Sequence, residues 1–101
     1  MKNLLTIIID DEPNAILSLQ TILNEYCEGI EIVATANGAL EGIKKTNTFH
    51  PDLVFLDVDM PGGNGFDFLE AFPNRDFKVI FTTASSDHAL KAIKAKAEDY
   101  L

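Results

Sequence analysis

Apolar residues along this chain form short runs that alternate with longer segments in which they recur at helical spacing. Two of the runs, Leu4 to Ile9 and Leu53 to Leu56, are dominated by apolar residues instead of alternating with polar ones, as in parallel strands covered on both faces. Between them, apolar residues from 15 to 26 recur every three or four positions, with Pro13 near the expected first turn and Gly29 past the end. The pattern predicts two central strands and a first helix.

The remaining segments continue this alternation. They predict an edge strand at 30–34, a second helix at 39–46, a short third helix at 66–72, a fourth strand at 78–82, a fourth helix at 87–96 and the start of a fifth strand at 100–101. Pro51 introduces the run at 53–56, which is the third strand in chain order. Strands and helices that alternate at this spacing indicate an α/β fold with a parallel sheet and right-handed crossovers.

Length and composition favour one cytoplasmic domain. A chain of 101 residues has room for a single core, and its apolar runs are too short to cross a membrane. The first residues reach acids before any signal-peptide cleavage pattern. The net charge of -8 argues against direct binding to nucleic acid, which depends on Lys and Arg neutralising phosphates. The single cysteine, Cys27, continues the apolar stripe of the first helix, so we expect a small core residue.

Acidic residues follow two of the predicted strands at the point where each strand ends. Asp10 and Asp11 come after the first strand, and Asp57 comes directly after the third. If these strands are parallel neighbours, the three carboxylates converge at the carboxyl edge of the sheet, where open α/β sheets bind ligands. Two like charges about 4 Å apart repel by roughly 4 kcal/mol at an effective dielectric constant near 20. An all-oxygen cluster of this kind predicts Mg²⁺ or Mn²⁺.

The acids at 10–12 have a second interpretation. Asp10, Asp11 and Glu12 stand just before the first helix, where acids commonly cap the helix and favour its positive end. Asp57 does not share this interpretation, because a loop rich in Pro and Gly follows it and no helix begins there. The position of Asp57 therefore favours a functional role.

Three segments in this order resemble the receiver domains of two-component response regulators. They are IIIDDEP at 7–13, LVFLDVDMPGGNG at 53–65 and VIFTTAS at 79–85. The resemblance covers residues 1–101 and implies a doubly wound, flavodoxin-like parallel sheet with strand order 2-1-3-4-5. The stretch ALKAIKAKAEDYL at 89–101 is similar to receivers that are attached to LytTR-type DNA-binding domains.

The resemblance implies a phosphorylation-controlled signalling switch and assigns roles to the acids. Asp57 would take a phosphoryl group from a sensor histidine kinase, in a reaction that needs Mg²⁺ or Mn²⁺. Asp11 would bind the metal directly and Asp10 mainly through water, while Asp57 itself and the backbone carbonyl of Asp59 would complete the metal ligands. Such a domain catalyses only its own phosphorylation and dephosphorylation, so no separate enzyme activity is expected.

Two further residues would couple the chemistry to the surface. Thr83 would donate its hydroxyl to a phosphoryl oxygen, and Tyr100 would be the aromatic that rotates in response. Each also has a structural explanation, since threonine suits a strand and tyrosine a core. An output domain such as a LytTR-type DNA-binding domain, outside this chain, and a homodimer formed on phosphorylation would follow from the same resemblance.

The sequence departs from the family near its end. Receivers carry a lysine three residues after the switch aromatic, and the sequence ends one residue after Tyr100. Lys94 and Lys96 lie too early to replace it, and no room remains for a fifth helix. We therefore expect a receiver that is incomplete at its carboxyl terminus, with impaired phosphorylation and one sheet face partly uncovered.

Two other functions fit parts of the pattern. Asp57 and Asp59 after an apolar strand also resemble the paired aspartates of haloacid-dehalogenase-type phosphatases, although Met60 and Pro61 depart from that motif and Asp10 and Asp11 would have no role in it. A pseudo-receiver that binds a partner without phosphorylation is the other alternative.

Overall fold

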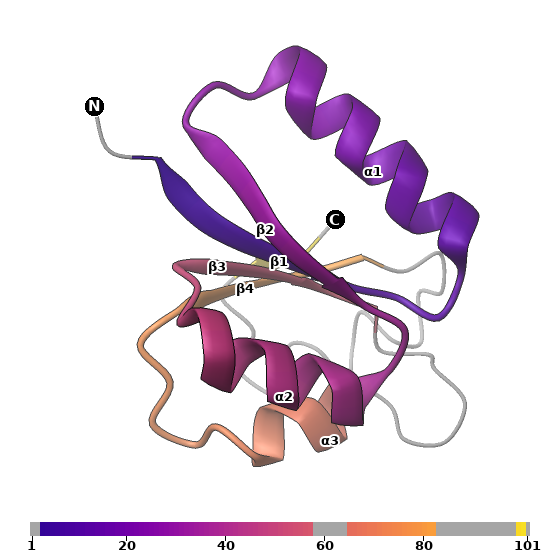
Figure 1. Cartoon of the computed structure of the whole chain (residues 1–101). Helices are drawn as coiled ribbons and strands as arrows, with labels where there is room; N and C mark the ends of the chain where they lie inside the picture. The colour runs from indigo at the N-terminus through magenta and orange to yellow at the C-terminus, as the bar shows by residue number, and fades with distance from the viewer. Residues whose placement is uncertain (1–2, 58–64, 83–98, 101) are drawn as a thin grey trace.

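A parallel sheet with helices on both faces makes up the described part of the chain (Figure 1). The computed structural model describes residues 3–57 and 65–82, together with the backbone of 99–100. The strands have the order β2-β1-β3-β4-β5, and every neighbouring pair is parallel. Their bounds are β1 Leu4–Ile9, β2 Ile30–Ala36, β3 Leu53–Leu56, β4 Lys78–Phe81 and β5 Asp99–Tyr100. This order confirms the predicted fold class.

The helices begin and end where local residues allow it. Helix α1 (Pro13–Tyr26) starts at a proline, whose fixed φ suits the first helical position. Helix α2 (Ala39–Phe49) ends at His50, which adopts a left-handed conformation with φ 47°. Helix α3 (Gly65–Glu70) is shorter than predicted, so that Phe72 lies beyond its end. β2 and α2 are longer than predicted, and the helix expected at 87–96 lies outside the described residues.

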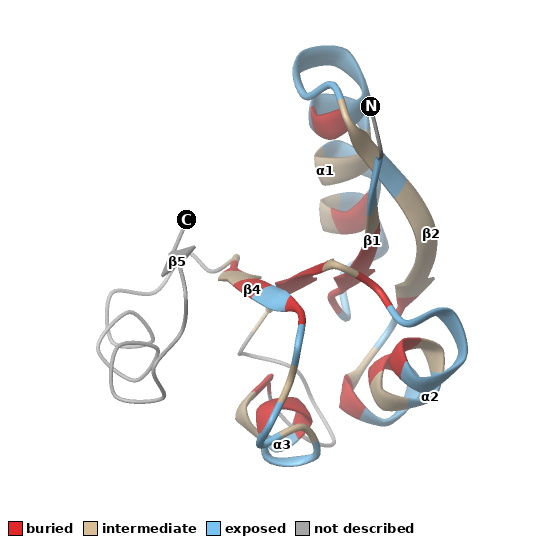
Figure 2. Ribbon diagram, turned by 90° about the vertical axis from the view of Figure 1, so that its left-hand side faces the viewer, coloured by how far each residue is buried: buried red, intermediate tan, exposed pale blue. Residues whose placement is uncertain are grey.

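Each face of the sheet has its own apolar core, because side chains alternate between the two faces along every strand. The larger core lies between the sheet and helices α2 and α3, and the smaller one lies between the sheet and α1 (Figures 1 and 2). Burying a side chain such as Ile contributes about 1.5–3 kcal/mol. The buried members of the larger core are Ile7, Ile9, Ala36, Ala39, Val54, Leu56, Phe68, Leu69, Phe77, Val79 and Phe81. Those of the smaller core are Ile8, Ile16, Leu23, Leu53 and Phe55.

Several apolar residues of the helices lie in solvent. The expectation that Cys27 is a core residue is wrong, because it lies just past the end of α1 and is exposed. Tyr26 is 78% exposed and Ile22 is 51% exposed, although both belong to the helical pattern that predicted α1. Only a narrow stripe of this helix, centred on Ile16 and Leu23, is buried.

Helix α2 approaches the sheet closely at one glycine. A Cβ atom added to Gly42 would lie 2.6 Å from Cδ1 of Ile9, which is fully buried. Real Cβ atoms do not come so near another carbon, so a larger residue at 42 would push Ile9 aside. Gly42 therefore sets the distance between α2 and the end of β1, directly before Asp10.

The amino ends of three strands are joined through Asp52. Its carboxylate oxygen Oδ2 accepts a hydrogen bond from the Leu5 N–H at 2.9 Å, and its own N–H donates to the Leu5 carbonyl at 2.7 Å. The Asp52 carbonyl accepts a third bond, from the Lys78 N–H at 3.0 Å. One residue thus ties β1, β3 and β4 together at this end of the sheet.

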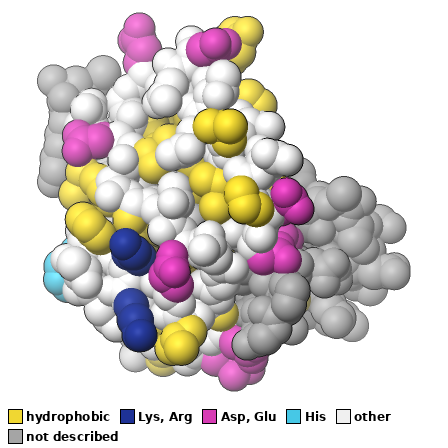
Figure 3. All heavy atoms as spheres, turned by 45° about the vertical axis from the view of Figure 1, so that its right-hand side comes forward, with side chains coloured by type: hydrophobic (Ala, Val, Ile, Leu, Met, Phe, Trp, Pro, Cys, Tyr) yellow, Lys and Arg dark blue, Asp and Glu magenta, His cyan; other side chains and the backbone are white. Residues whose placement is uncertain are grey.

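The surface is predominantly acidic, in keeping with the net charge of -8. Acidic side chains are distributed over the face shown in Figure 3, whereas basic ones gather in one part of it. Among the described residues, no helix has the length and apolar character needed to cross a membrane.

Candidate metal centre

The backbone of the sheet places Asp10 and Asp57 beside each other. β1 and β3 are parallel neighbours with Ile9 opposite Leu56, and each strand is followed at once by its aspartate. The Asp57 N–H donates to the Ile9 carbonyl at 2.9 Å, and the Asp10 N–H donates to the Ala36 carbonyl at 3.0 Å. Continuing strand hydrogen bonds therefore hold both acids at the carboxyl edge of the sheet.

The side chains of Asp10, Asp11 and Asp57 converge there. Each of the three offers a carboxylate oxygen, and these oxygens all lie within 4.8 Å of one another. The predicted convergence of the three acids at one edge of the sheet is therefore present in the structure. So much negative charge in a small volume is favourable only when protons or a cation reduce it.

Asp10 is the most buried of the three acids, with 8% of its surface exposed. The pKa of its carboxyl is raised from 3.8 to about 6, and burial is the largest cause. A hydrogen bond from the Glu12 N–H to Oδ1, at 2.9 Å, acts in the opposite direction because it stabilises the charged form. The charge of Asp57 and a hydrogen bond between the two side chains are further causes that raise this pKa. Asp10 therefore holds a proton in mildly acidic solution, which a bound cation would displace.

The donor set fits Mg²⁺ or Mn²⁺. Mg²⁺ takes oxygen ligands at about 2.0–2.1 Å and keeps several waters, so that a few carboxylates suffice to hold it. Among the residues that the structure describes, the cluster contains carboxylates alone, without the His or Cys ligands that zinc prefers in structural sites. Carboxylates whose oxygens already lie this close need little rearrangement to bind one small dication.

The capping interpretation of these acids receives no support from the start of α1. The residue at the N-cap position is Glu12, and its side chain makes no capping hydrogen bond. The Glu12 carbonyl instead accepts bonds from the N–H groups of Ala15 and Ile16, as the helix itself requires. The Asp10 carboxylate accepts a hydrogen bond from the Glu12 N–H, just before α1, and so shapes the turn between β1 and α1.

The local bond from Glu12 to Asp10 was not anticipated from the sequence. An aspartate that accepts from the N–H two residues further on is a common turn, and the order Asp10, Asp11, Glu12, Pro13 is compatible with it. The residue pattern alone did not distinguish this turn from a helix cap.

Three of the predicted site residues fall wholly or partly outside the described part of the chain. Asp59 and Thr83 belong to the segments 58–64 and 83–98, which the structure does not describe. The backbone of Tyr100 forms the end of β5 opposite Phe81, but its side chain is not described. The roles of these three residues therefore remain predictions.

A family model described as the response regulator receiver domain matches residues 6–101 of this chain. The chain belongs to this family. The match confirms the resemblance in the three sequence segments and favours a receiver over a phosphatase of the haloacid-dehalogenase type.

Known response regulators are similar to this receiver over nearly all of its length. An uncharacterized response regulatory protein of Vibrio cholerae is 41% identical over 96 residues, which cover 94% of this chain and 40% of that protein. The transcriptional regulatory protein BtsR of Escherichia coli is 38% identical over 96 residues, with the same coverage. The receiver therefore spans about 40% of the length of these curated relatives.

Solved receiver structures share the fold. The N-terminal domain of a response regulator receiver protein from Methanoculleus marisnigri has a TM-score of 0.80 and 28% identity, and the match covers 97% of this chain and 82% of that chain. The response regulator domain of Thermotoga maritima CheB has a TM-score of 0.84 at 22% identity, covering 99% and 78% respectively. At 22% identity, the likeness to the CheB domain concerns the fold alone.

Proposed function

We propose that this receiver accepts a phosphoryl group on Asp57, in a reaction that requires Mg²⁺ or Mn²⁺ held by Asp10, Asp11 and Asp57. One observation carries the proposal: carboxylate oxygens of these three residues lie within 4.8 Å of one another in a chain of the receiver family. The bound cation would offset the charge of the cluster and of the incoming phosphoryl group.

Asp57 is the acid best placed to be modified. It follows β3 in the middle of the sheet and is partly exposed, whereas Asp10 beside it is buried. A carboxylate oxygen of Asp57 would form a bond to phosphorus as the bond from phosphorus to the kinase imidazole nitrogen breaks. The imidazole leaves with a proton from solvent, and an acyl phosphate remains. Asp10 and Asp11, which receive no phosphoryl group, hold the cation.

Other parts of the proposal rest on the family and on the sequence. Thr83 would bind a phosphoryl oxygen, the carbonyl of Asp59 would be a further metal ligand, and Tyr100 would respond to phosphorylation. A sensor histidine kinase would supply the phosphoryl group in the cytoplasm. Relatives of about two and a half times this length, among them a transcriptional regulatory protein, support an output domain of DNA-binding type in the whole protein. A LytTR-type domain and dimerisation on phosphorylation belong to this proposal too.

Mass spectrometry of the intact protein tests the proposal. After incubation with acetyl phosphate and Mg²⁺, we expect one added phosphoryl group, which Asp57→Asn and removal of the metal with EDTA both abolish. Asp76→Asn is the matched control, because Asp76 is an exposed aspartate just before β4. Labelling that survives in Asp57→Asn would reject the assignment.

The full-length gene product should be tested beside this chain. The curated relatives are about two and a half times as long as this receiver, so the rate of labelling should be measured on both proteins. If the full-length protein binds its partner equally well before and after acetyl phosphate treatment and is never labelled, the pseudo-receiver alternative is favoured instead.

A further inference from the structure

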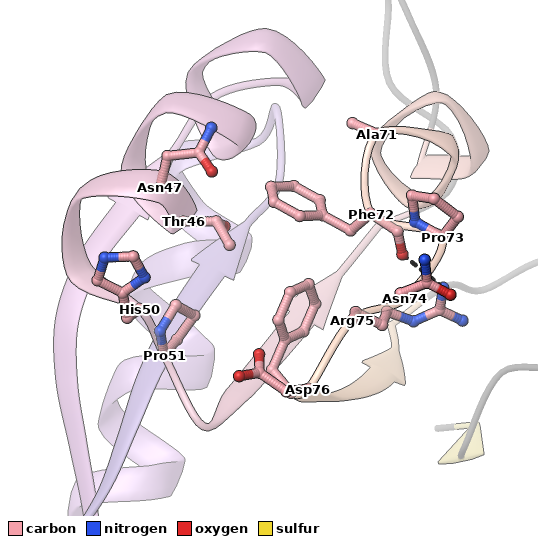
Figure 4. Close-up of a pocket in the computed structure, with 11 residues that line it drawn as sticks. Thr46, Asn47, His50, Pro51, Ala71, Phe72, Pro73, Asn74, Arg75 and Asp76 are labelled. Atoms are coloured by element: carbon pink, nitrogen blue, oxygen red, sulfur yellow. Dashed lines mark hydrogen bonds between the residues drawn. The ribbon is translucent and has the colours of Figure 1, made fainter.

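A second candidate site lies at the amino end of the sheet. An open cavity of about 420 Å³ is bordered by the end of α2, the residues before β3 and the segment between α3 and β4 (Figure 4). Small-molecule sites typically have volumes of about 300–1,000 Å³. Asp57 follows β3 and Pro51 precedes it, so the cavity is roughly 20 Å from the carboxylates, at about 3.3 Å per residue along a strand. It is therefore a separate site.

The walls of the cavity suit a flat ring. Phe72 reaches from the segment after α3 toward the last turn of α2 (Figure 4). Phe77 also lines the cavity, and its ring meets that of Phe72 edge to face, with centroids 5.4 Å apart and planes at 76°. Buried Pro51 contributes a further apolar surface. Aromatic rings prefer such edge-to-face or offset neighbours, so a third ring can extend the arrangement.

The charged residues of the lining are balanced and so do not favour a strongly ionic ligand. One basic residue, Arg75, and one acidic residue, Asp76, line the cavity, and the other lining residues carry no fixed charge. The Arg75 guanidinium already donates from Nη1 to the Phe72 carbonyl at 3.2 Å. An anion or a cation would therefore find no excess of opposite charge, whereas an uncharged molecule would not be repelled.

Thr46 supplies an unsatisfied polar group in the same wall. Its side chain lines the cavity on the side of α2 opposite Phe72 (Figure 4). The residue is 4% exposed, and its buried Oγ1 has no hydrogen-bond partner. Threonines 21 and 48, which are also helical but exposed, donate to the carbonyls of Leu17 and Lys44 at 3.0 and 2.9 Å. Of these three helical threonines, Thr46 is the one that borders the cavity and the one whose hydroxyl does not donate to a carbonyl of the preceding helical turn.

We propose that this cavity binds a small, uncharged bicyclic heteroaromatic molecule with one ring N–H group. The ring lies against Phe72, Phe77 and Pro51, and the N–H donates to the Thr46 hydroxyl. Because Oγ1 is covered, the proposal requires Thr46 to change between the two χ1 rotamers that threonine occupies in helices, so that its hydroxyl faces the ligand. The site is independent of phosphorylation, so its test stands apart from that of Asp57.

Indole is a suitable probe, because it has the proposed size and a single N–H. We expect titration of the ¹⁵N-labelled protein with indole to shift backbone amide signals of residues 46–50 and 71–77 in a saturable manner. The matched probe 1-methylindole lacks the N–H and should bind about fivefold more weakly, the factor expected for one net hydrogen bond. Absence of shifts up to the solubility of indole would overturn the proposal and leave a space filled by water. Shifts confined to other residues, or equal affinities for the two probes, would also overturn it.

A pair of variants tests the role of Thr46. Thr46→Val keeps the shape of the side chain and removes the hydroxyl, so it should weaken indole binding about fivefold and leave 1-methylindole binding unchanged. Thr48→Val, on the same helix but exposed, should alter neither. If Thr46→Val retains the preference for indole over 1-methylindole, the hydroxyl is not the partner and the proposal fails. Should that variant not fold, the comparison of the two probes on the unmodified protein still decides.

Discussion

The two ends of the sheet differ in what their side chains contribute to stability. At the carboxyl end, Asp10 is buried beside other acids, and its raised pKa shows that its charged form is disfavoured there. At the amino end, Phe77 is 5% exposed and packs against the rings of Phe68 and Phe72, while Asp52 joins three strands. The side chains at the amino end therefore stabilise the fold, whereas the buried charge of Asp10 at the carboxyl end opposes folding. Residues that a fold retains at a cost point to function.

The largest effect is expected at the amino end. Phe77→Ala should lower the free energy of unfolding by about 3–5 kcal/mol, because it removes a buried ring and leaves a cavity. Phe49→Ala is the control, since that ring at the end of α2 is 39% exposed and should cost much less. Urea denaturation curves measure both values. Similar losses in the two variants would show that the amino end is less tightly packed than the structure indicates.

The carboxyl end should respond in the opposite direction. Asp10→Asn should raise the free energy of unfolding by about 2 kcal/mol at pH 7 in EDTA, because it removes a charge that burial disfavours. Asp11→Asn is the matched control and should change stability by only a few tenths of a kcal/mol, since Asp11 is exposed. A loss of stability in Asp10→Asn would mean that the acids support the fold after all.

The stability difference between Asp10→Asn and the unmodified protein should depend on pH. The pKa of Asp10 is raised in the folded state, so the proton it binds contributes stability that is fully present below pH 3.8 and is lost as pH rises through about 6. The stability of Asp10→Asn relative to the unmodified protein should therefore be lowest in acid and reach a plateau above pH 6. Thermal unfolding of both proteins in EDTA across this range is the measurement. A difference that does not change with pH would contradict the raised pKa.

Bound Mg²⁺ should offset the destabilising charge of the acids at the carboxyl end of the sheet. At ten times its dissociation constant, a bound ion should stabilise the folded protein by about 1.4 kcal/mol. The gain should shrink in Asp10→Asn and in Asp11→Asn but persist in Asp76→Asn, whose carboxylate is not part of the cluster. The gain in stability is measured as the change in unfolding temperature on addition of Mg²⁺. If all three variants retain the full gain, the ion binds elsewhere.

The smallest effect concerns the approach of α2 to β1. Gly42→Ala should lower stability by about 1 kcal/mol, since crowding against Ile9 outweighs the better helix propensity of alanine. Gly38→Ala should cost about 0.5 kcal/mol, because glycine is preferred to alanine at the N-cap of α2, although nothing lies within 4 Å of the added Cβ. Equal effects in urea denaturation would show that Ile9 can move aside freely.

The strands and the acid cluster could be predicted because both depend on local pattern. Apolar runs fix the centre of the sheet, and parallel neighbours necessarily bring Asp10 and Asp57 to the same edge. Helix ends were less predictable. Helix α2 continues to Phe49, beyond the prediction, because a left-handed His50 ends it, and nothing in the sequence pattern marks that conformation.

The amino-end cavity could not be predicted, since its lining comes from segments that share no periodicity. Thr46 belongs to a helix and Phe77 precedes a strand, and neither residue alone suggests a site. The sequence pattern also did not show which apolar residues of the helices are exposed. Leu40 fits the pattern of a helix but is 68% exposed, because Ala39 and Gly42 form the buried face of α2.

The central place of β1 has a consequence for synthesis on the ribosome. β1 is made before both of its neighbours, because one of its edges pairs with β2 and the other with β3, whose first residue is Leu53. At about 5–20 residues per second, roughly 2–10 s pass between the two strands. During that interval Ile7, Ile8 and Ile9 form an apolar segment with an unpaired edge, the kind of segment that aggregates. The nascent chain is therefore most vulnerable before β3 emerges, and chaperones that bind short apolar segments would act on β1 in that interval.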